Sequence, residues 1–169
     1  MTPREIEPMT LQEIEDLRPG LKTDAEIEQR FFGFLVYGLR DEYYLVDEHP
    51  DDPDVDTRDP WKFSSQPEEA LKILEASPGW RAWHETEGLV IQLTRTVGDG
   101  LTWITGIGRD KLFEMAICKA ALTLVACIKE WEARQATLDM AGDVTLEMTA
   151  EFEPAAPENL ITIKDEGEA

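Results

Sequence analysis

Acidic side chains at alternate positions are the first feature of this sequence that could do chemistry. Asp52, Asp54 and Asp56 form the D-x-D-x-D pattern with which a calcium-binding loop of the EF-hand type begins. The rest of that pattern is missing, because position six is Thr57 where the turn needs glycine, and position twelve is Phe63 where the ion needs a bidentate glutamate. We therefore expect a solvated acidic loop and no metal site.

The histidines and cysteines form no recognisable catalytic or zinc-binding set. His49 lies among carboxylates and His84 lies on a predicted strand. As a general base beside an aspartate, His49 would still lack a nucleophile and an oxyanion hole. Cys118 and Cys127 lie on opposite sides of one predicted helix, so they can neither pair nor share a metal ion. We expect buried thiols in a reducing cytoplasm, no catalytic residues and no cofactor.

The charge balance restricts the partners of the chain. Its 169 residues include 16 Lys and Arg against 36 Asp and Glu, which gives a net charge of −20. Such a field repels nucleic acid and anionic membranes and attracts basic protein surfaces, although a high charge can also serve solubility alone. The sequence has neither an apolar run long enough to cross a bilayer nor a signal peptide at its start. We expect no direct nucleic-acid binding and no membrane association.

Composition divides the chain into three parts. Residues 1–22 form a polar N-terminal arm, residues 23–134 carry the periodic apolar pattern of an α/β domain, and residues 135–169 form an acidic C-terminal extension. Within the extension, Asp143–Phe152 alternates well enough to add a fourth strand to the domain.

Residues 41–60 interrupt the domain with an acidic, proline-rich segment. From Asp41 to Asp59 it holds nine acidic residues against one basic residue, Arg58. Prolines and repelling charges oppose regular structure, so this segment predicts a loop.

The rest of the domain predicts helices on both sides of a three-stranded meander. Alternating residues joined by short glycine-bearing connectors favour antiparallel hairpins, and capping boxes at Thr23–Glu26 and Ser65–Glu68 predict helix starts. The fold class is therefore α/β in the α+β sense, a helix–sheet–helix sandwich with a three- to four-stranded antiparallel meander. The predicted elements are a short helix at Leu11–Leu17, helices over Asp24–Leu39 and Asp110–Arg134, a helix containing Ala70, Ile73 and Leu74, and strands over Trp80–Glu85, Leu89–Val97 and Leu101–Ile107.

The last predicted helix is apolar on two sides. One stripe should face the sheet, and the second side is rich in small residues that permit close approach of another helix. Either the first predicted helix covers this second side, or the side is an interface with a subunit or partner. We expect the first helix there, because Phe31, Phe34 and Leu35 need a surface to cover. The sheet-facing stripe is Phe113, Ile117, Ala120, Leu124, Ile128 and Trp131, and the second side carries Met115, Cys118, Val125 and Ala126.

Two stretches of the domain carry a family resemblance. Ser64–Leu74 (SSQPEEALKIL) and Met115–Leu122 (MAICKAAL) flank the predicted strands, and in this order they resemble the phage ABA sandwich domain of small phage and prophage proteins. The resemblance covers mainly Lys62–Leu124, with Phe63 where the family has tyrosine. It implies a helix–sheet–helix sandwich and a phage or prophage origin. It implies no catalytic residues, because the family has none established.

Charge and resemblance together predict a non-enzymatic phage or prophage accessory protein that binds a host protein with a basic surface in the host cytoplasm. It would act as an acidic DNA mimic or an anti-defence inhibitor. The alternatives are a structural, homo-oligomeric phage component and, below it, a metal-dependent hydrolase. The predicted partner-binding residues are Asp47, Glu48, Asp51, Asp52, Asp54, Asp56, Asp59 and Trp61.

Overall fold

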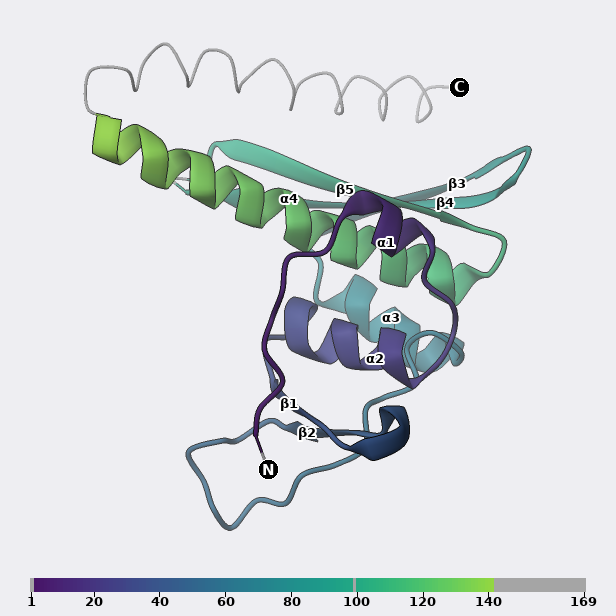
Figure 1. Cartoon of the computed structure of the whole chain (residues 1–169). Helices are drawn as coiled ribbons and strands as arrows, with labels where there is room; N and C mark the ends of the chain where they lie inside the picture. The colour runs from purple at the N-terminus through teal and green to yellow at the C-terminus, as the bar shows by residue number, and fades with distance from the viewer. Residues whose placement is uncertain (1, 99, 142–169) are drawn as a thin grey trace.

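The chain folds as an α+β domain with two separate antiparallel sheets. This computed structural model describes residues 2–98 and 100–141. In chain order the elements are α1 Leu11–Glu15, α2 Leu21–Glu26, η1 Ile27–Phe31, β1 Leu35–Gly38, η2 Arg40–Glu42, β2 Tyr44–Asp47, α3 Pro67–Glu75, β3 Gly79–Glu85, β4 Gly88–Val97, β5 Thr102–Asp110 and α4 Phe113–Ala141. The sheets are β1–β2 and β3–β4–β5, and α2, α3 and α4 lie between them (Figure 1). The predicted α+β class and the three-stranded antiparallel meander are confirmed. The predicted helix–sheet–helix order is wrong for the described residues, because there α2, α3 and α4 all lie on one side of the meander, between it and the β1–β2 sheet.

Helix α4 crosses β5 at very short range. A Cβ atom built on Gly106 would lie 2.3 Å from the backbone nitrogen of Leu124, and one built on Gly108 would lie 2.2 Å from the carbonyl oxygen of Ala116. Glycine on the strand therefore lets the backbones of helix and strand touch, and small side chains on the helix, Ala116 and Ala120, complete the contact. This contact fixes where α4 sits on the sheet.

Helix α4 is buried on all sides over two turns near its start. Every residue of Met115–Leu122 is buried, the charged Lys119 included. The β3–β4–β5 sheet covers one side of α4, and η1, α1 and α3 cover the other. Lys119 donates from Nζ to the carbonyl oxygen of Glu15 at 2.8 Å and pairs with Asp110 at 2.9 Å, which ties α1 to the start of α4. The expectation that the first predicted helix covers the second side is confirmed for its η1 part, with α1 and α3 completing the cover.

The first predicted helix is wrong in both its start and its second half. Helix α2 begins after Gly20, so Thr23 lies inside it and forms no capping box; its hydroxyl instead donates to the carbonyl oxygen of Arg18 at 2.6 Å. The helical path continues through the π-turn η1 and ends at Gly33, whose φ of 76° is the left-handed conformation that stops helices. The β-prone residues Leu35–Gly38 then form β1 rather than a further helical turn.

The predicted loop over residues 41–60 is too long at its start. Tyr44–Asp47 forms β2, which pairs with β1 in the register Val36↔Val46 and alternates buried and half-buried side chains. The chain start adds to the other edge of β1, where Pro3 bridges Tyr37 and the Arg4 amide donates to the Val36 carbonyl at 2.7 Å. The alternating side chains of Tyr44–Asp47 (YLVD) therefore favour a strand more strongly than the neighbouring acidic residues oppose one.

Helix α3 confirms its predicted stop near Pro78 and its predicted inner face. Ala70, Ile73 and Leu74 are buried. The predicted capping box at Ser65 and Glu68 is wrong, because Pro67 is the first helical residue, which makes Gln66 the N-cap. The prediction that this helix packs on the meander is also wrong, since α3 packs on the opposite side of α4.

Helix α4 is longer than predicted and begins later. It starts at Phe113 rather than near Asp110, whose carboxylate instead accepts the backbone N–H of Leu112 at 2.9 Å, and it runs beyond Arg134 to Ala141. The predicted short helix in the N-terminal arm is confirmed as α1, where Thr10 and Glu13 form a capping box. The predicted fourth strand, Asp143–Phe152, lies outside the described residues.

Candidate functional site

Residues 48–57 form a loop that Arg58 closes at its base. We call this segment the 48–57 loop. The Val46 amide donates to the carbonyl oxygen of Arg58 at 2.7 Å, and the Arg58 amide donates back to Val46 at 2.9 Å. Arg58 thereby pairs with the free edge of β2. The loop leaves the domain at the end that carries β1 and β2, away from α4 and the larger sheet (Figure 1).

Two aspartates, one at the end of β2 and one inside the 48–57 loop, shape the path of the loop. Asp47 accepts the backbone N–H of His49, and Asp52 accepts the backbone N–H of Asp54, each at 3.0 Å. These are Asx turns, in which a carboxylate replaces a backbone acceptor. Two of the eight predicted partner-binding residues therefore also hold the loop's conformation.

The guanidinium of Arg58 joins the loop to the core. It binds Glu28 through both terminal nitrogens, at 2.7 and 3.0 Å, and its Nε donates to Glu48 at 2.8 Å. The Glu28 side chain is 0% exposed, so this is a buried ion pair. Burial lowers the pKa of Arg58, but its hydrogen bonds to Glu28 and Glu48 outweigh burial, and the pKa is raised above its ordinary value. Glu48, a predicted partner residue, is thus already engaged in an ion pair within the protein.

Trp61 is held at the foot of the same cluster. Its backbone N–H donates to Glu28 at 2.9 Å. Arg58 lies over the indole ring at 4.2 Å from its centroid and the Lys72 ammonium lies at 3.3 Å, both within cation–π range. The ring also meets Phe63 edge-on, with centroids 5.9 Å apart. The indole is half-buried, so its predicted role as a partner contact stays a prediction with little free ring face to support it.

The remaining predicted residues divide by their contacts. The hydroxyl of Tyr43 donates to Asp59, and this bond to a carboxylate raises the pKa of Tyr43. Within residues 2–98 and 100–141, the side chains of Asp51, Asp54 and Asp56 form no hydrogen bond or ion pair, and all of them are exposed. Five of the seven predicted acids thus lie in the 48–57 loop, between Asp47 at the end of β2 and Asp59 after Arg58. In the described part of the chain, Asp51, Asp54 and Asp56 are the three of these acids whose side chains have no partner.

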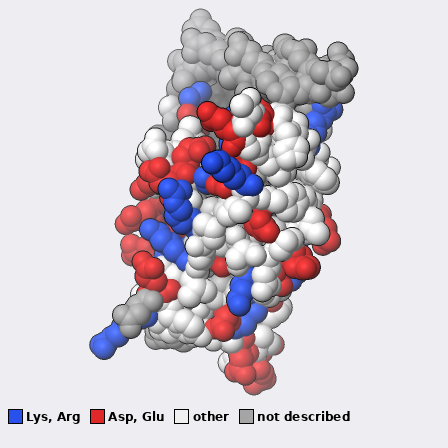
Figure 2. All heavy atoms as spheres, turned by 90° about the vertical axis from the view of Figure 1, so that its right-hand side faces the viewer, with Lys and Arg blue, Asp and Glu red and all other residues white. Residues whose placement is uncertain are grey.

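Acidic side chains are also widespread outside the loop. Figure 2 shows Lys and Arg interspersed among Asp and Glu over most of the viewed face, with a group of acidic side chains at its lower end. That end is the one from which the 48–57 loop projects in Figure 1.

A second buried network lies on the helical segment α2–η1. Glu26 pairs with Arg4 from the N-terminal arm and with Arg30, and the Glu26 side chain is 3% exposed. Asp24 accepts the backbone N–H of Ser64 at 2.8 Å. Burial raises the pKa of Glu26, but hydrogen bonds from Arg30 and Arg4 outweigh it and the pKa is lowered. For Asp24, burial dominates the bond from Ser64, and the pKa is raised.

Glu26→Gln is expected to lower the free energy of unfolding at pH 7 by about 2 kcal/mol, because two arginines lose a charged acceptor. The Glu26 pKa is lowered by folding, so its carboxylate stabilises the fold above its ordinary value of 4.5. That stability is lost as the pH falls through the folded-state pKa. Urea unfolding between pH 7 and pH 3 should therefore show the difference from the parent chain shrinking below about pH 4.5.

Asp24→Asn is the matched control of opposite sign. In the parent chain, folding raises the pKa of the Asp24 carboxyl, so ionising this group lowers the stability of the fold as the pH rises above 3.8. Asparagine keeps an oxygen for Ser64, and the variant should be at least as stable as the parent at pH 7, with the gain absent at pH 3. If the free energy of unfolding of both variants changed with pH in the same way, the opposite roles assigned to the Glu26 and Asp24 carboxylates would be contradicted.

Both thiols are at least partly withdrawn from solvent. Cys118 is buried, and burial strongly raises its thiol pKa; Cys127 is half-buried, with its pKa raised by the same cause. In the described part of the chain, no three His, Cys, Asp or Glu side chains are arranged to hold a metal ion. Nor does any helix in that part have the length and apolar character needed to cross a membrane.

Sequence reasoning missed the buried charges. Asp24, Glu26 and Glu28 are charged residues of a type that is usually exposed, yet all are at most 2% exposed. One feature of the sequence could have indicated an ion pair. Arg58 is the single basic residue between Asp41 and Asp59, so a salt bridge with an acidic side chain was to be expected. Its deepest partner, Glu28, lies 30 residues earlier and had no local signal.

Comparison with known proteins adds no relative. No family model, no curated protein and no solved structure matches this chain.

Proposed function

We propose that this chain is a non-enzymatic binding protein that contacts a basic surface of another protein through the 48–57 loop. The observation that carries the proposal is that some residues of the loop hold its conformation while other, acidic residues are exposed to solvent. Arg58 and the Asx turns fix its base and path, while Asp51, Asp54 and Asp56 remain exposed with no partner among residues 2–98 and 100–141. Preorganised carboxylates on a protein of charge −20 attract cationic groups and keep anions away.

The partner is a host protein with a basic groove, and the protein would work as an acidic DNA mimic or anti-defence inhibitor in the host cytoplasm. The resemblance of Lys62–Leu124 to the phage ABA sandwich domain supports a phage or prophage origin, and it remains a resemblance without a matching family model.

The test uses two variants of equal charge change. In Asp51→Asn/Asp54→Asn/Asp56→Asn, the unengaged loop acids are neutral, whereas Glu68→Gln/Glu75→Gln/Glu87→Gln neutralises three exposed acids elsewhere. The tagged parent chain and both variants are used to capture host proteins at low and high salt, followed by affinity measurement for any captured protein. The loop variant should weaken binding by at least about tenfold and the control by much less.

Competition then separates mimicry from other binding. A DNA mimic should be displaced by double-stranded DNA, and its affinity should fall steeply with salt. Capture that is equally weakened by both variants would mean that general charge alone acts, and capture unaffected by the loop variant would refute a role for the loop.

A homo-oligomeric structural component is the second candidate. Trp80 and Trp103 on the larger sheet are 50% and 45% exposed, which is the kind of apolar surface that subunit contacts cover. This candidate requires a stable oligomer whose sedimentation is the same at low and high salt. The metal-dependent hydrolase gains no set of donor side chains from the described residues and ranks last.

A further inference from the structure

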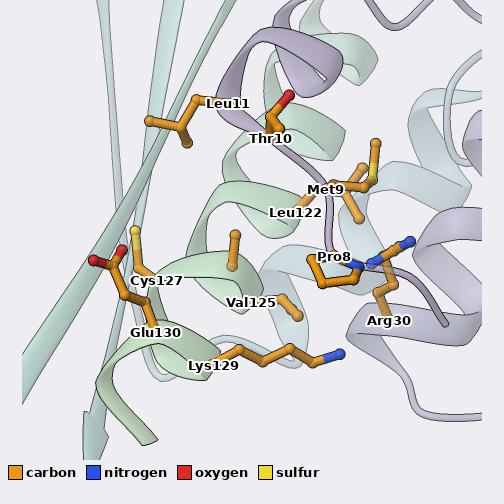
Figure 3. A pocket seen from close by; sticks show the side chains of 11 residues that line it. Pro8, Met9, Thr10, Leu11, Arg30, Leu122, Val125, Cys127, Lys129 and Glu130 are labelled. Atoms are coloured by element: carbon orange, nitrogen blue, oxygen red, sulfur yellow. The ribbon is translucent and has the colours of Figure 1, made fainter. Parts of the chain in front are cut away.

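A cavity of about 450 Å³ lies between the N-terminal segment and the outer side of α4 (Figure 3). It is remote in the chain from the 48–57 loop. Met9 from the arm and Leu122, Val125 and Cys127 from α4 give it a largely apolar wall. Its volume lies in the range of small-molecule sites in proteins.

One side of this cavity carries a cation with unused donors. The Arg30 side chain is only 8% exposed, and its Nε pairs with Glu26. Among the described residues, its two terminal nitrogens form no hydrogen bond, and neither counts as a fully buried, unsatisfied atom. Because Arg30 lines the cavity, these nitrogens have donors to offer there. Figure 3 shows the Arg30 guanidinium directed toward Pro8.

A second cation lies at the same side of the opening. Lys129 is exposed and forms no ion pair with any described residue. In Figure 3 its side chain extends toward the side on which Arg30 lies, while Cys127 and Glu130 lie across from them. Glu130 pairs instead with Arg134 at 2.7 Å. A chain of charge −20 thus presents two cations beside an apolar hollow.

We propose that this cavity binds a medium-chain fatty acid, with the carboxylate on Arg30 and Lys129 and the alkyl chain along Met9, Leu122 and Val125 toward Cys127. A guanidinium offers paired donors that match a carboxylate. A single negative charge fits this protein better than a phosphate dianion, because the surrounding negative field opposes each added charge. The alkyl chain would cover the apolar wall that is open to solvent without it.

Cys127 provides a direct reporter of occupancy. It lines the cavity, whereas Cys118 is fully buried, so maleimide should label Cys127 in the folded protein and leave Cys118 as an internal control. Decanoate, used below its micelle concentration, should slow the labelling saturably, as followed by intact-protein mass. Decanol has the same chain without the charge, and its half-protection concentration should be about tenfold higher.

Variants separate the charge from the cavity. Lys129→Gln should weaken protection by decanoate about fivefold, while Lys111→Gln, an equal charge change at an exposed site on the β5–α4 turn, should leave it unchanged. Val125→Trp should fill the cavity and abolish protection; if it unfolds the chain, the lysine pair and the decanol comparison decide. Labelling that decanoate does not slow, equal protection by decanol, or equal loss in both lysine variants would overturn the proposal.

Discussion

Gly108→Ala is expected to lower the free energy of unfolding by at least about 3 kcal/mol, the upper end of the usual cost of overpacking. The added methyl group would meet the Ala116 carbonyl oxygen at 2.2 Å and the Ala120 nitrogen at 2.3 Å. Both are backbone atoms of α4, so no side-chain rotation relieves the clash, and the whole helix must lift from β5. Urea unfolding followed by circular dichroism measures the change.

Gly79→Ala is the matched control on the same sheet. The nearest atom to its added methyl group would be the Thr94 carbonyl oxygen at 3.9 Å, an ordinary contact distance. Its effect should stay within about 0.5 kcal/mol of the parent chain. Equal stability of the two alanine variants would mean that α4 does not approach β5 as closely as described.

Arg58→Met should lower the free energy of unfolding by about 3–5 kcal/mol, the usual cost of removing one partner of a buried ion pair. Methionine preserves much of the stem that packs on Trp61 but leaves the buried carboxylate of Glu28 without a counter-charge. The 48–57 loop also loses the bond between Arg58 and Glu48. Thermal or urea unfolding gives the magnitude, and limited proteolysis should show faster cleavage within the loop.

Two comparisons isolate the buried pair. Glu28→Gln combined with Arg58→Met removes the uncompensated charge, so the double variant should be more stable than Arg58→Met alone. Arg109→Met breaks an exposed pair with Glu85, where Arg109 is 55% exposed, and should cost about 1 kcal/mol or less. An Arg58→Met variant no less stable than Arg109→Met would contradict the anchoring role of Arg58.

Periodic patterns predicted the larger sheet and its helix well. The strands alternate, their connectors contain glycine, and the two-sided apolar pattern of the last helix was a correct sign of cover from both sides. The apolar pattern gave a wrong prediction at Leu35–Gly38, where the same spacing of apolar residues is compatible with both a helix and a strand. Leu35–Gly38 fits a helical face and a strand face equally, and only the left-handed Gly33 before it decides for a strand.

The candidate site was predictable in its composition but not in its connections. The exposed acids of the loop follow directly from a run of aspartates and prolines. The anchoring of the loop does not, because the pairing of Arg58 with Glu28 depends on how the α2–η1 segment packs against the β1–β2 sheet, a tertiary contact that local sequence does not encode. The cavity beside α4 was likewise hidden, since Val125 and Cys127 look like any buried helix positions until the arm is placed across them.

The smaller sheet gains protection against aggregation from the two segments that flank it. A free strand edge is a template on which other chains can pair. Here the outer edge of β1 is occupied by Pro3 and Arg4, and the outer edge of β2 is occupied by Arg58. Proline has no N–H to extend a ladder, and the Arg58 pairing is a single bridge rather than a strand. A hairpin that would otherwise recruit copies of itself is thus closed on both sides by the chain's own residues.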